Sequence, residues 1–318
     1  MDARKGNIYE ILNGNKQFLI PVYQRYYSWD IEQCTRLWND IVEMQKKGKV
    51  GHFVGSIGNI AEQAMPTGVQ KYMIIDGQQR MTTLSLLLLA LRDYAIKNPD
   101  DTTINARRID NMLLKNEYES GDERYKLLLT ETDRDILMRL VEGKPIPDDT
   151  RSKLLDNYKF FAGKIADKEL QPAEVYESIG KLQIVNITLD RSVDDAQAIF
   201  ESLNSTGLAL TEGDKIRNYI LMGLSPKVQN HCYDCYWVKI EKCTGGDVSG
   251  FVRDYLSIKQ QITPTISTVY RAFKGYAGDA RLPVEKLLED LLRYARYFEK
   301  LLTCKSGLNE KQLDDCLY

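Results

Sequence analysis

Two apolar segments with different patterns meet between residues 69 and 91. Residues 69–75, "VQKYMII", have the aromatic and β-branched character of a strand. Residues 81–91 form a longer apolar run, which suits a buried helix better than a strand. The join between them is polar and flexible, and it consists of Asp76, Gly77, Gln78, Gln79 and Arg80. The pattern therefore predicts a strand that turns directly into a core helix.

The same kind of pattern organises the rest of residues 1–97. Segment 16–29 opens as a strand, and Asp30 with Gln33 three residues later resembles a capping box at the start of a helix. Apolar residues then recur with helical spacing. A further strand at 52–60, "HFVGSIGNI", precedes the strand described above. The order strand, helix, two strands, helix predicts a compact α/β lobe.

Beyond this lobe the chain is predicted to be mainly helical. One strand candidate, 182–190, precedes a helix around residues 195–204, and Thr211 is a candidate N-cap for the next helix. We expect residues 98–225 to form a helical region that contains this strand, and residues 226–318 to form a helical C-terminal region. The predicted fold class is α+β.

Composition and charge narrow the functional classes. The 318 residues are 43% hydrophobic and 28% charged, with a formal net charge of −2. These values are typical of a soluble globular protein and exclude a uniformly basic nucleic-acid coat, so any DNA contact must come from a local patch. The start of the chain has no apolar signal segment, and the run at 81–91 is too short to span a bilayer. We expect a cytoplasmic protein with reduced cysteines and no membrane contact.

The residues at the join have the chemistry of a phosphate site. A strand that turns tightly into a helix leaves N–H groups unpaired at the positive end of the helix dipole. Gly77 lets the backbone approach a ligand, the two glutamines offer donors and acceptors, and Arg80 offers a planar fork for phosphate. Asp76 would orient a water or hold Mg²⁺. The alternative is a plain turn with a solvated arginine, and the chain contains neither G-x-x-x-x-G-K-[ST] nor G-x-G-x-x-G.

A second stretch suggests a surface for bases. Tyr23, Gln24 and Arg25 lie in an aromatic cluster that can stack on bases and hydrogen-bond to them, although a buried aromatic corner would have the same pattern. His52 stands at the start of a predicted strand, close in sequence to the join. It is a candidate base or phosphate contact, and the alternative is a structural histidine at a strand end.

A third stretch suggests another wall of the same site. Asp214, Arg217 and Asn218 have the spacing of one helical face. Asn204 precedes a tight "STG" turn beside them. A solvated helix face is the alternative explanation.

Four segments, taken together and in order, resemble one known family: "IPVYQRYYSW", "HFVGSI", "IIDGQQRMTTL" and "FESLNSTGLALTEGDKIRNYIL". Over roughly residues 7–222 the chain is similar to the N-terminal domain family of the GmrSD type IV restriction enzymes, whose core is similar to ParB and sulfiredoxin. The resemblance implies a ParB-like N-terminal lobe and a nucleoside-triphosphate hydrolase within a DNA restriction and antiviral defence system. Family members restrict modified phage DNA, and they couple nucleotide hydrolysis to a His-Asn-His nuclease domain.

Residue roles follow from the resemblance and the patterns together. The resemblance implies that the catalytic nucleotide-hydrolysis motif comprises Asp76, Gln78, Gln79 and Arg80. By its chemistry, Asp76 would hold Mg²⁺ or position the attacking water. Nucleotide contacts are expected from Gly77, Thr82, Thr83, Asn204, Asp214, Arg217 and Asn218. The residues expected to line the cleft or sense DNA are Tyr23, Gln24, Arg25 and His52.

The chain departs from the full family pattern in one respect. Its histidines are His52 and His231 alone, and no nuclease chemistry follows residue 226. We therefore expect that it does not cut DNA by itself. It would be the sensor portion of a longer enzyme, a separate subunit that partners a nuclease, or a stand-alone member of the family. A homo-oligomer is a further alternative. A function from another class remains, namely a non-catalytic DNA-binding or assembly module switched by nucleotide.

Overall fold

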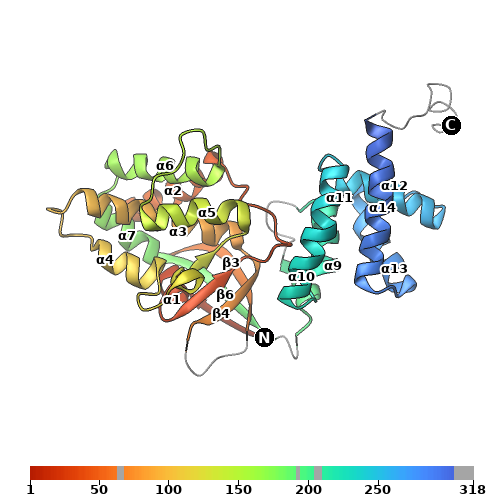
Figure 1. The fold of residues 1–318 in the computed structure, drawn as a ribbon. Helices are drawn as coiled ribbons and strands as arrows, with labels where there is room; N and C mark the ends of the chain where they lie inside the picture. The colour runs from red at the N-terminus through yellow and green to blue at the C-terminus, as the bar shows by residue number, and fades with distance from the viewer. Residues whose placement is uncertain (63–67, 191–193, 204–209, 304–318) are drawn as a thin grey trace. The chain divides into compact units, whose positions relative to one another are not determined.

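The chain divides into two compact units, Met1–Leu203 and Asn204–Tyr318 (Figure 1). The computed structural model describes residues 1–62, 68–190, 194–203 and 210–303.

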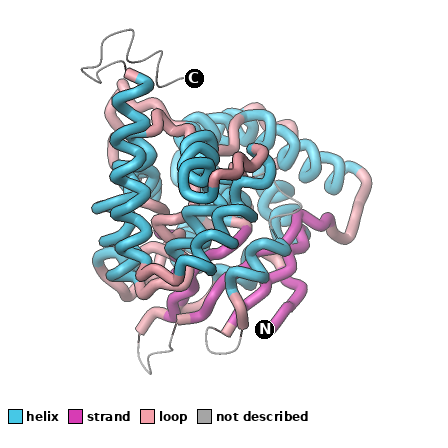
Figure 2. Tube along the Cα trace, turned by 90° about the vertical axis from the view of Figure 1, so that its right-hand side faces the viewer, coloured by secondary structure: helices cyan, strands magenta, loops and turns pink. Residues whose placement is uncertain are grey.

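The first unit contains a mixed sheet, whose strands are magenta in Figure 2. In the described residues the strands are β1 (Asp2–Gly6), β2 (Lys16–Leu19), β3 (His52–Ala61), β4 (Gln70–Asp76), β5 (Leu127–Leu128) and β6 (Leu182–Leu189). Their spatial order is β1-β6-β3-β4-β2-β5. The β1–β6 and β3–β4 pairs are antiparallel, whereas β6–β3, β4–β2 and β2–β5 are parallel. The neighbouring strands β3 and β6 are more than 100 residues apart in the chain.

Helices cover the sheet. The α-helices of this unit are α1 (Ile8–Leu12), α2 (Ile31–Lys46), α3 (Gln78–Lys97), α4 (Ala106–Ile109), α5 (Glu131–Glu142), α6 (Lys153–Ala166), α7 (Pro172–Lys181) and α8 (Ala196–Leu203). A π-helical turn, η1 (Asp110–Leu114), and a 3-10 turn, η2 (Gly121–Arg124), connect them. Helices α2, α3, α6 and α7 pack together on one side of the sheet (Figure 1), whereas α8 contacts β3 and β4.

Helix α3 forms the centre of this unit. It packs against α6 and α7, and almost every side chain between Met81 and Leu91 is buried. A helix that is apolar on all sides must be surrounded by other elements, which explains why its sequence shows a continuous apolar run. Burying the leucines of this run stabilises the unit by roughly 1.5–3 kcal/mol for each side chain. The core helix predicted after the polar join is thus confirmed.

The second unit is helical throughout its described residues. Its elements are α9 (Glu212–Leu221), α10 (Pro226–Cys232), the π-helical η4 (Tyr233–Trp237), α11 (Val238–Cys243), α12 (Val248–Gln260), the 3-10 turn η5 (Ile266–Thr268), α13 (Val269–Ala280) and α14 (Val284–Leu302). Its core includes Trp237, Phe251 and Phe273, which are at most 2% exposed. Helix α14 contributes one apolar face, including Leu288 and Leu291, and contacts α11 and α12.

These observations confirm the predicted fold class, a mixed α/β N-terminal part followed by a mainly helical part. Residue 97, where we expected the first lobe to end, lies inside the first unit. Strands β5 and β6 and helices α4 to α8 follow it in the chain, and the two strands complete the N-terminal sheet. The helices of residues 98–203 therefore share the core of the N-terminal sheet instead of forming a region of their own.

Candidate nucleotide site

The polar join is a glycine turn between a strand and a long helix. Strand β4 ends at Asp76, and Gly77 takes the N-cap position of α3 with φ 85° and ψ 10°. This left-handed conformation favours glycine, and a Cβ atom at Gly77 would lie 2.7 Å from the carbonyl oxygen of Ser56. Because Gly77 has no side chain to cap the helix, it leaves the first-turn N–H groups of α3 without a side-chain acceptor from the N-cap. The positive end of the helix dipole thus lies beside Asp76.

Asp76 and Arg80 carry opposite charges at this turn and attract each other; they are called the Asp76–Arg80 pair below. Burial raises the pKa of the Asp76 carboxyl group, while the Arg80 guanidinium and the Gly77 N–H oppose that shift. Burial also lowers the pKa of Arg80, and Asp76 opposes it. In both groups the loss of hydration is the largest effect, so the two charges are partly desolvated. Such a pair can interact strongly with a charged ligand, because water screens it weakly.

Strand β3 holds Arg80 in place. The Nη1 group of Arg80 donates a hydrogen bond to the carbonyl oxygen of Ser56. Gly55 has φ 112°, and a Cβ atom there would lie 2.5 Å from Nη2 of Arg80. Gly55 and Ser56 were not among the residues predicted for the site. A glycine inside a strand pattern is the signal that could have found them, since it often marks a close approach of another group.

The two glutamines of the motif have different environments. The Oε1 atom of Gln79 accepts hydrogen bonds from the backbone N–H groups of Ser28 (2.8 Å) and Trp29 (3.3 Å), and its Nε2 donates to the carbonyl oxygen of Tyr26 (3.1 Å). Gln79 therefore fastens the 26–29 segment to α3. Gln78 is also buried, and its Nε2 donates to the carbonyl oxygen of Arg25 at 3.3 Å. Its buried Oε1 has no hydrogen-bond partner among the residues that the structure describes.

The aromatic segment before α2 is largely packed into the first unit. Tyr23 is fully buried and its hydroxyl group contacts the sulfur of Met73, whereas Gln24 is 5% exposed and donates to the carbonyl oxygen of Ile75 at 2.9 Å. Neither side chain can reach DNA in this conformation. Arg25 is half-buried and Tyr26 is 45% exposed, so these two offer the accessible surface of the segment.

A small cavity of about 10 Å³ lies under the join. Gln78, Thr82 and Asp133 are among the residues that line it. Its volume is close to that of one water molecule. Asp133, which we did not anticipate, accepts a hydrogen bond from the Tyr27 N–H at 2.7 Å, and burial raises its pKa. Nothing in the local sequence of α5 distinguishes this aspartate from a solvated helix residue.

Thr83 and His52 have structural partners. The Thr83 hydroxyl group bonds to the Tyr27 hydroxyl (2.7 Å) and to the Gln79 carbonyl oxygen (2.8 Å). His52 begins β3, and its Nε2 lies 3.4 Å from Asp40 Oδ2 at the surface of the unit.

The expected third stretch lies in the second unit. Thr211 caps α9, and Thr211 and Asp214 form a capping box. Arg217 is 5% exposed, and its guanidinium pairs with Asp214 (2.7 Å) and Glu241 (2.6 Å) of the same unit. Asn218 is also buried. Asn204 lies outside the described residues. The role of these residues as a second wall stays a prediction.

The first unit is therefore an α/β domain in which a desolvated charged pair meets an open helix N-terminus at the end of a strand. Residues 8–221 match the family described as the GmrSD restriction endonuclease, N-terminal domain, and the chain belongs to this family. The match covers more than half of the sequence. No curated protein was found that matches the chain.

As a member of this family, the protein is part of a restriction system. The family acts on DNA. In the described ranges, no helix is both long enough and apolar enough to cross a membrane.

Proposed function

We propose that the first unit binds and hydrolyses a nucleoside triphosphate and that this reaction serves as the sensor step of a modification-dependent restriction system. The observation that carries the proposal is the uncapped N-terminus of α3 beside the desolvated Asp76–Arg80 pair. A helix N-terminus attracts phosphate, and an arginine in a poorly hydrated site stabilises the charge that develops on a transferred phosphoryl group.

The residues of the join would have separate roles. Asp76 would orient the water that attacks the terminal phosphorus, and Arg80 would contact the phosphate oxygens with the N–H groups that Ser56 does not occupy. The unpartnered Oε1 of Gln78 would accept a hydrogen bond from the ligand or from a bound water. Gln79 would act as a positioning residue, because its polar atoms already bind the 26–29 segment.

The donor set also fits a Mg²⁺ ion that arrives with the nucleotide. Mg²⁺ commonly binds through one or two carboxylates together with substrate phosphates and waters, so the carboxylate of Asp76 alone would be sufficient on the protein side. The ion would neutralise phosphate charge. Asp76 is half-buried and ends β4 beside the first turn of α3, so a bound ion there would lie next to the helix N-terminus.

Phosphate release by the purified chain tests the proposal. The four ribonucleoside triphosphates are supplied with Mg²⁺, with and without DNA from modified and unmodified sources. We expect release with at least one of them, and Asp76→Asn and Arg80→Ala to lower the rate by about tenfold or more. Arg36→Ala is the control, because Arg36 is an exposed arginine on α2 that pairs with Glu32. Melting curves of every variant exclude unfolding as the cause.

The outcome also separates the proposal from the nucleotide-switched binding module. Nucleotide binding without phosphate release, with or without DNA, would favour that module and would refute hydrolysis. DNA that accelerates hydrolysis in the wild type would support the sensor role.

A further inference from the structure

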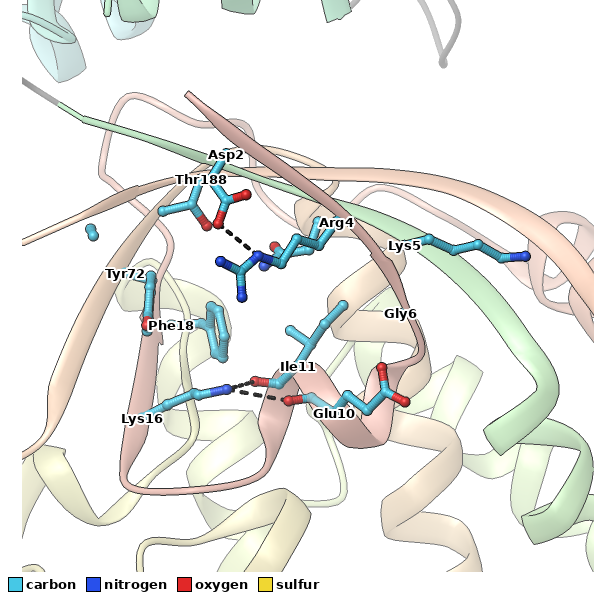
Figure 3. A pocket seen from close by; sticks show the side chains of 12 residues that line it. Asp2, Arg4, Lys5, Gly6, Glu10, Ile11, Lys16, Phe18, Tyr72 and Thr188 are labelled. Atoms are coloured by element: carbon cyan, nitrogen blue, oxygen red, sulfur yellow. Dashed lines mark hydrogen bonds and ion pairs between the residues drawn. The ribbon is translucent and has the colours of Figure 1, made fainter. Parts of the chain in front are cut away.

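A second hollow of the first unit lies apart from the join. It has a volume of about 430 Å³ and lies between β1, β2, β4, β6 and α1 (Figure 3). This volume is within the range of roughly 300–1,000 Å³ that is usual for small-ligand pockets. None of its lining residues belongs to the candidate nucleotide site. Tyr72, one of them, precedes Asp76 by four residues, which corresponds to about 13 Å along a strand.

Two stacked aromatic rings form one wall of this hollow. Phe18 of β2 and Tyr72 of β4 are register partners, and their ring centroids lie 5.2 Å apart with an interplanar angle of 19°. Phe18 is 2% exposed, whereas Tyr72 is half-buried. The accessible aromatic surface is therefore mainly that of Tyr72. An aromatic side chain in this setting offers a stacking surface to a planar ring.

Positive groups flank the aromatic wall. Figure 3 shows the Arg4 guanidinium reaching over the hollow from β1 and the Lys16 ammonium on the opposite side. Nζ of Lys16 donates to the carbonyl oxygens of Glu10 (3.2 Å) and Ile11 (3.1 Å). No carboxylate of the described residues lies within 4 Å of it. Behind it, the buried ammonium of Lys126 donates to the Gly14 carbonyl oxygen.

The acidic groups of the hollow, Asp2 and Glu10, offset only part of the positive charge of Arg4, Lys5 and Lys16. Asp2 pairs with Arg4 at 2.8 Å at the rim of the hollow, so Arg4 is partly neutralised, whereas the Glu10 carboxylate bonds to Asn7. Burial, and next the charge of Lys16, lower the pKa of Lys126 to about 8. The two lysines therefore repel each other, and an anion bound near them would relieve the repulsion.

We propose that this hollow binds one nucleotide unit, with the base against Tyr72 and the phosphate between Arg4 and Lys16. A nucleotide carries a planar ring that can stack on Tyr72 and a phosphate that can contact Arg4 and Lys16. A bare anion or an apolar ring can make only one of these two kinds of contact. Asn186 and Thr188 of β6 line the same hollow and can hydrogen-bond to the edge of a base. Oδ1 of Asn186 already accepts a hydrogen bond from Asn59 at 2.7 Å, so the group that Asn186 would offer to a base is its Nδ2 donor.

The nucleotide unit can be a free nucleotide or part of a single strand, and two binding arms distinguish these sources. Isothermal titration at low salt measures binding of the four deoxynucleoside monophosphates in one arm and a ten-nucleotide single strand in the other. The titrations are repeated in an Arg80→Ala background, which weakens nucleotide binding at the join. The result for the hollow therefore does not depend on whether the join binds nucleotide. We expect binding in at least one arm in both backgrounds, and this arm identifies the source.

Matched variants assign any binding to the hollow. Arg4→Gln should weaken it about tenfold, the usual effect of losing a hydrogen bond to a charged group. Tyr72→Leu should weaken it about fivefold or more, because stacking is lost. Arg36→Gln is the control for Arg4→Gln, since both arginine side chains are exposed (72% and 81%) and each pairs with a nearby carboxylate.

Three results would overturn the assignment. They are an absence of binding in both arms, an affinity for inorganic phosphate equal to that for the nucleotide, and equal effects of Arg4→Gln and Arg36→Gln. The Arg4 variant keeps the test decisive if Tyr72→Leu does not fold, because Arg4 lies on the surface of an edge strand.

Discussion

Gln79→Ala should destabilise the first unit, in contrast to the effect expected of a residue that only contacts a ligand. The substitution removes three hydrogen bonds, two from the N–H groups of Ser28 and Trp29 and one to the carbonyl oxygen of Tyr26. Each bond contributes about 1 kcal/mol, and Gln79 is only 6% exposed, so water cannot easily replace its side chain. We therefore expect a loss of about 3 kcal/mol in the free energy of unfolding.

Scanning calorimetry measures this effect. For a unit of this size, 1 kcal/mol lowers Tm by about 2–4 °C, so the transition of the first unit should move down by about 6–12 °C. Gln24→Ala is a graded control, because among the described residues the Gln24 side chain makes one hydrogen bond, to the Ile75 carbonyl oxygen, and the loss of this bond costs about 1 kcal/mol. A Gln79 variant that melts within about 2 °C of the wild type yet no longer binds nucleotide would refute the reasoning, because Gln79 would then be a ligand contact.

Three further results are expected. Gly77→Ala should lower the free energy of unfolding by more than about 1 kcal/mol, because Gly77 has a positive φ and an added Cβ would lie too close to Ser56. Gly163→Ala should raise it by about 0.5–1 kcal/mol, because Gly163 lies in α6 with open space around it. Denaturant titration of both variants measures these changes. Burial raises the folded pKa of Asp133 above its unfolded value of about 3.9, so the native state holds more protons between the two values and stability falls as pH rises through this window. Asp133→Asn should flatten that part of the pH–stability profile, while its oxygen can still accept the Tyr27 N–H. Plasmid from modified and unmodified hosts should stay intact with the chain, nucleotide and divalent metals, and metal-dependent cutting that persists after repurification would contradict the sensor assignment.

Local chemistry predicted the elements around the join because the signals there are short-range. The apolar run of α3, the capping box of Asp30 with Gln33 and the N-cap at Thr211 all depend on neighbours within four residues. Strand β1 was missed because "DARKG" has no alternation of apolar and polar residues, and as an edge strand it is held by pairing with β6. Helix α1 was not predicted either, although the capping box of Asn7 and Glu10 is a local signal for its start.

The candidate site was harder to predict because its contacts are long-range. The sequence identifies Gln79 as a polar residue at the start of a helix, but its partners are about 50 residues earlier in the chain. Without them, Gln78 and Gln79 look equivalent. The structure separates them, because one amide is fully engaged by the backbone and the other keeps an unpartnered oxygen. Likewise, an aromatic cluster does not reveal which of its members are buried, and Tyr23 and Gln24 are.

The hydrolase and the nucleotide-switched module differ in what Arg80 does when a ligand arrives. Its guanidinium has five N–H groups, and its hydrogen bond to Ser56 leaves others for phosphate oxygens. If Arg80 keeps this bond while it contacts the ligand, it presents a rigid charge to the phosphate, as stabilisation of a transition state requires. If it must leave Ser56, ligand binding breaks a contact with β3, and the change can pass through the sheet. Gln79 would transmit either event to the 26–29 segment, where Tyr26 is exposed. These four residues, Arg80, Ser56, Gln79 and Tyr26, can therefore support either turnover or signalling. The rate of phosphate release decides between the hydrolase and the nucleotide-switched module.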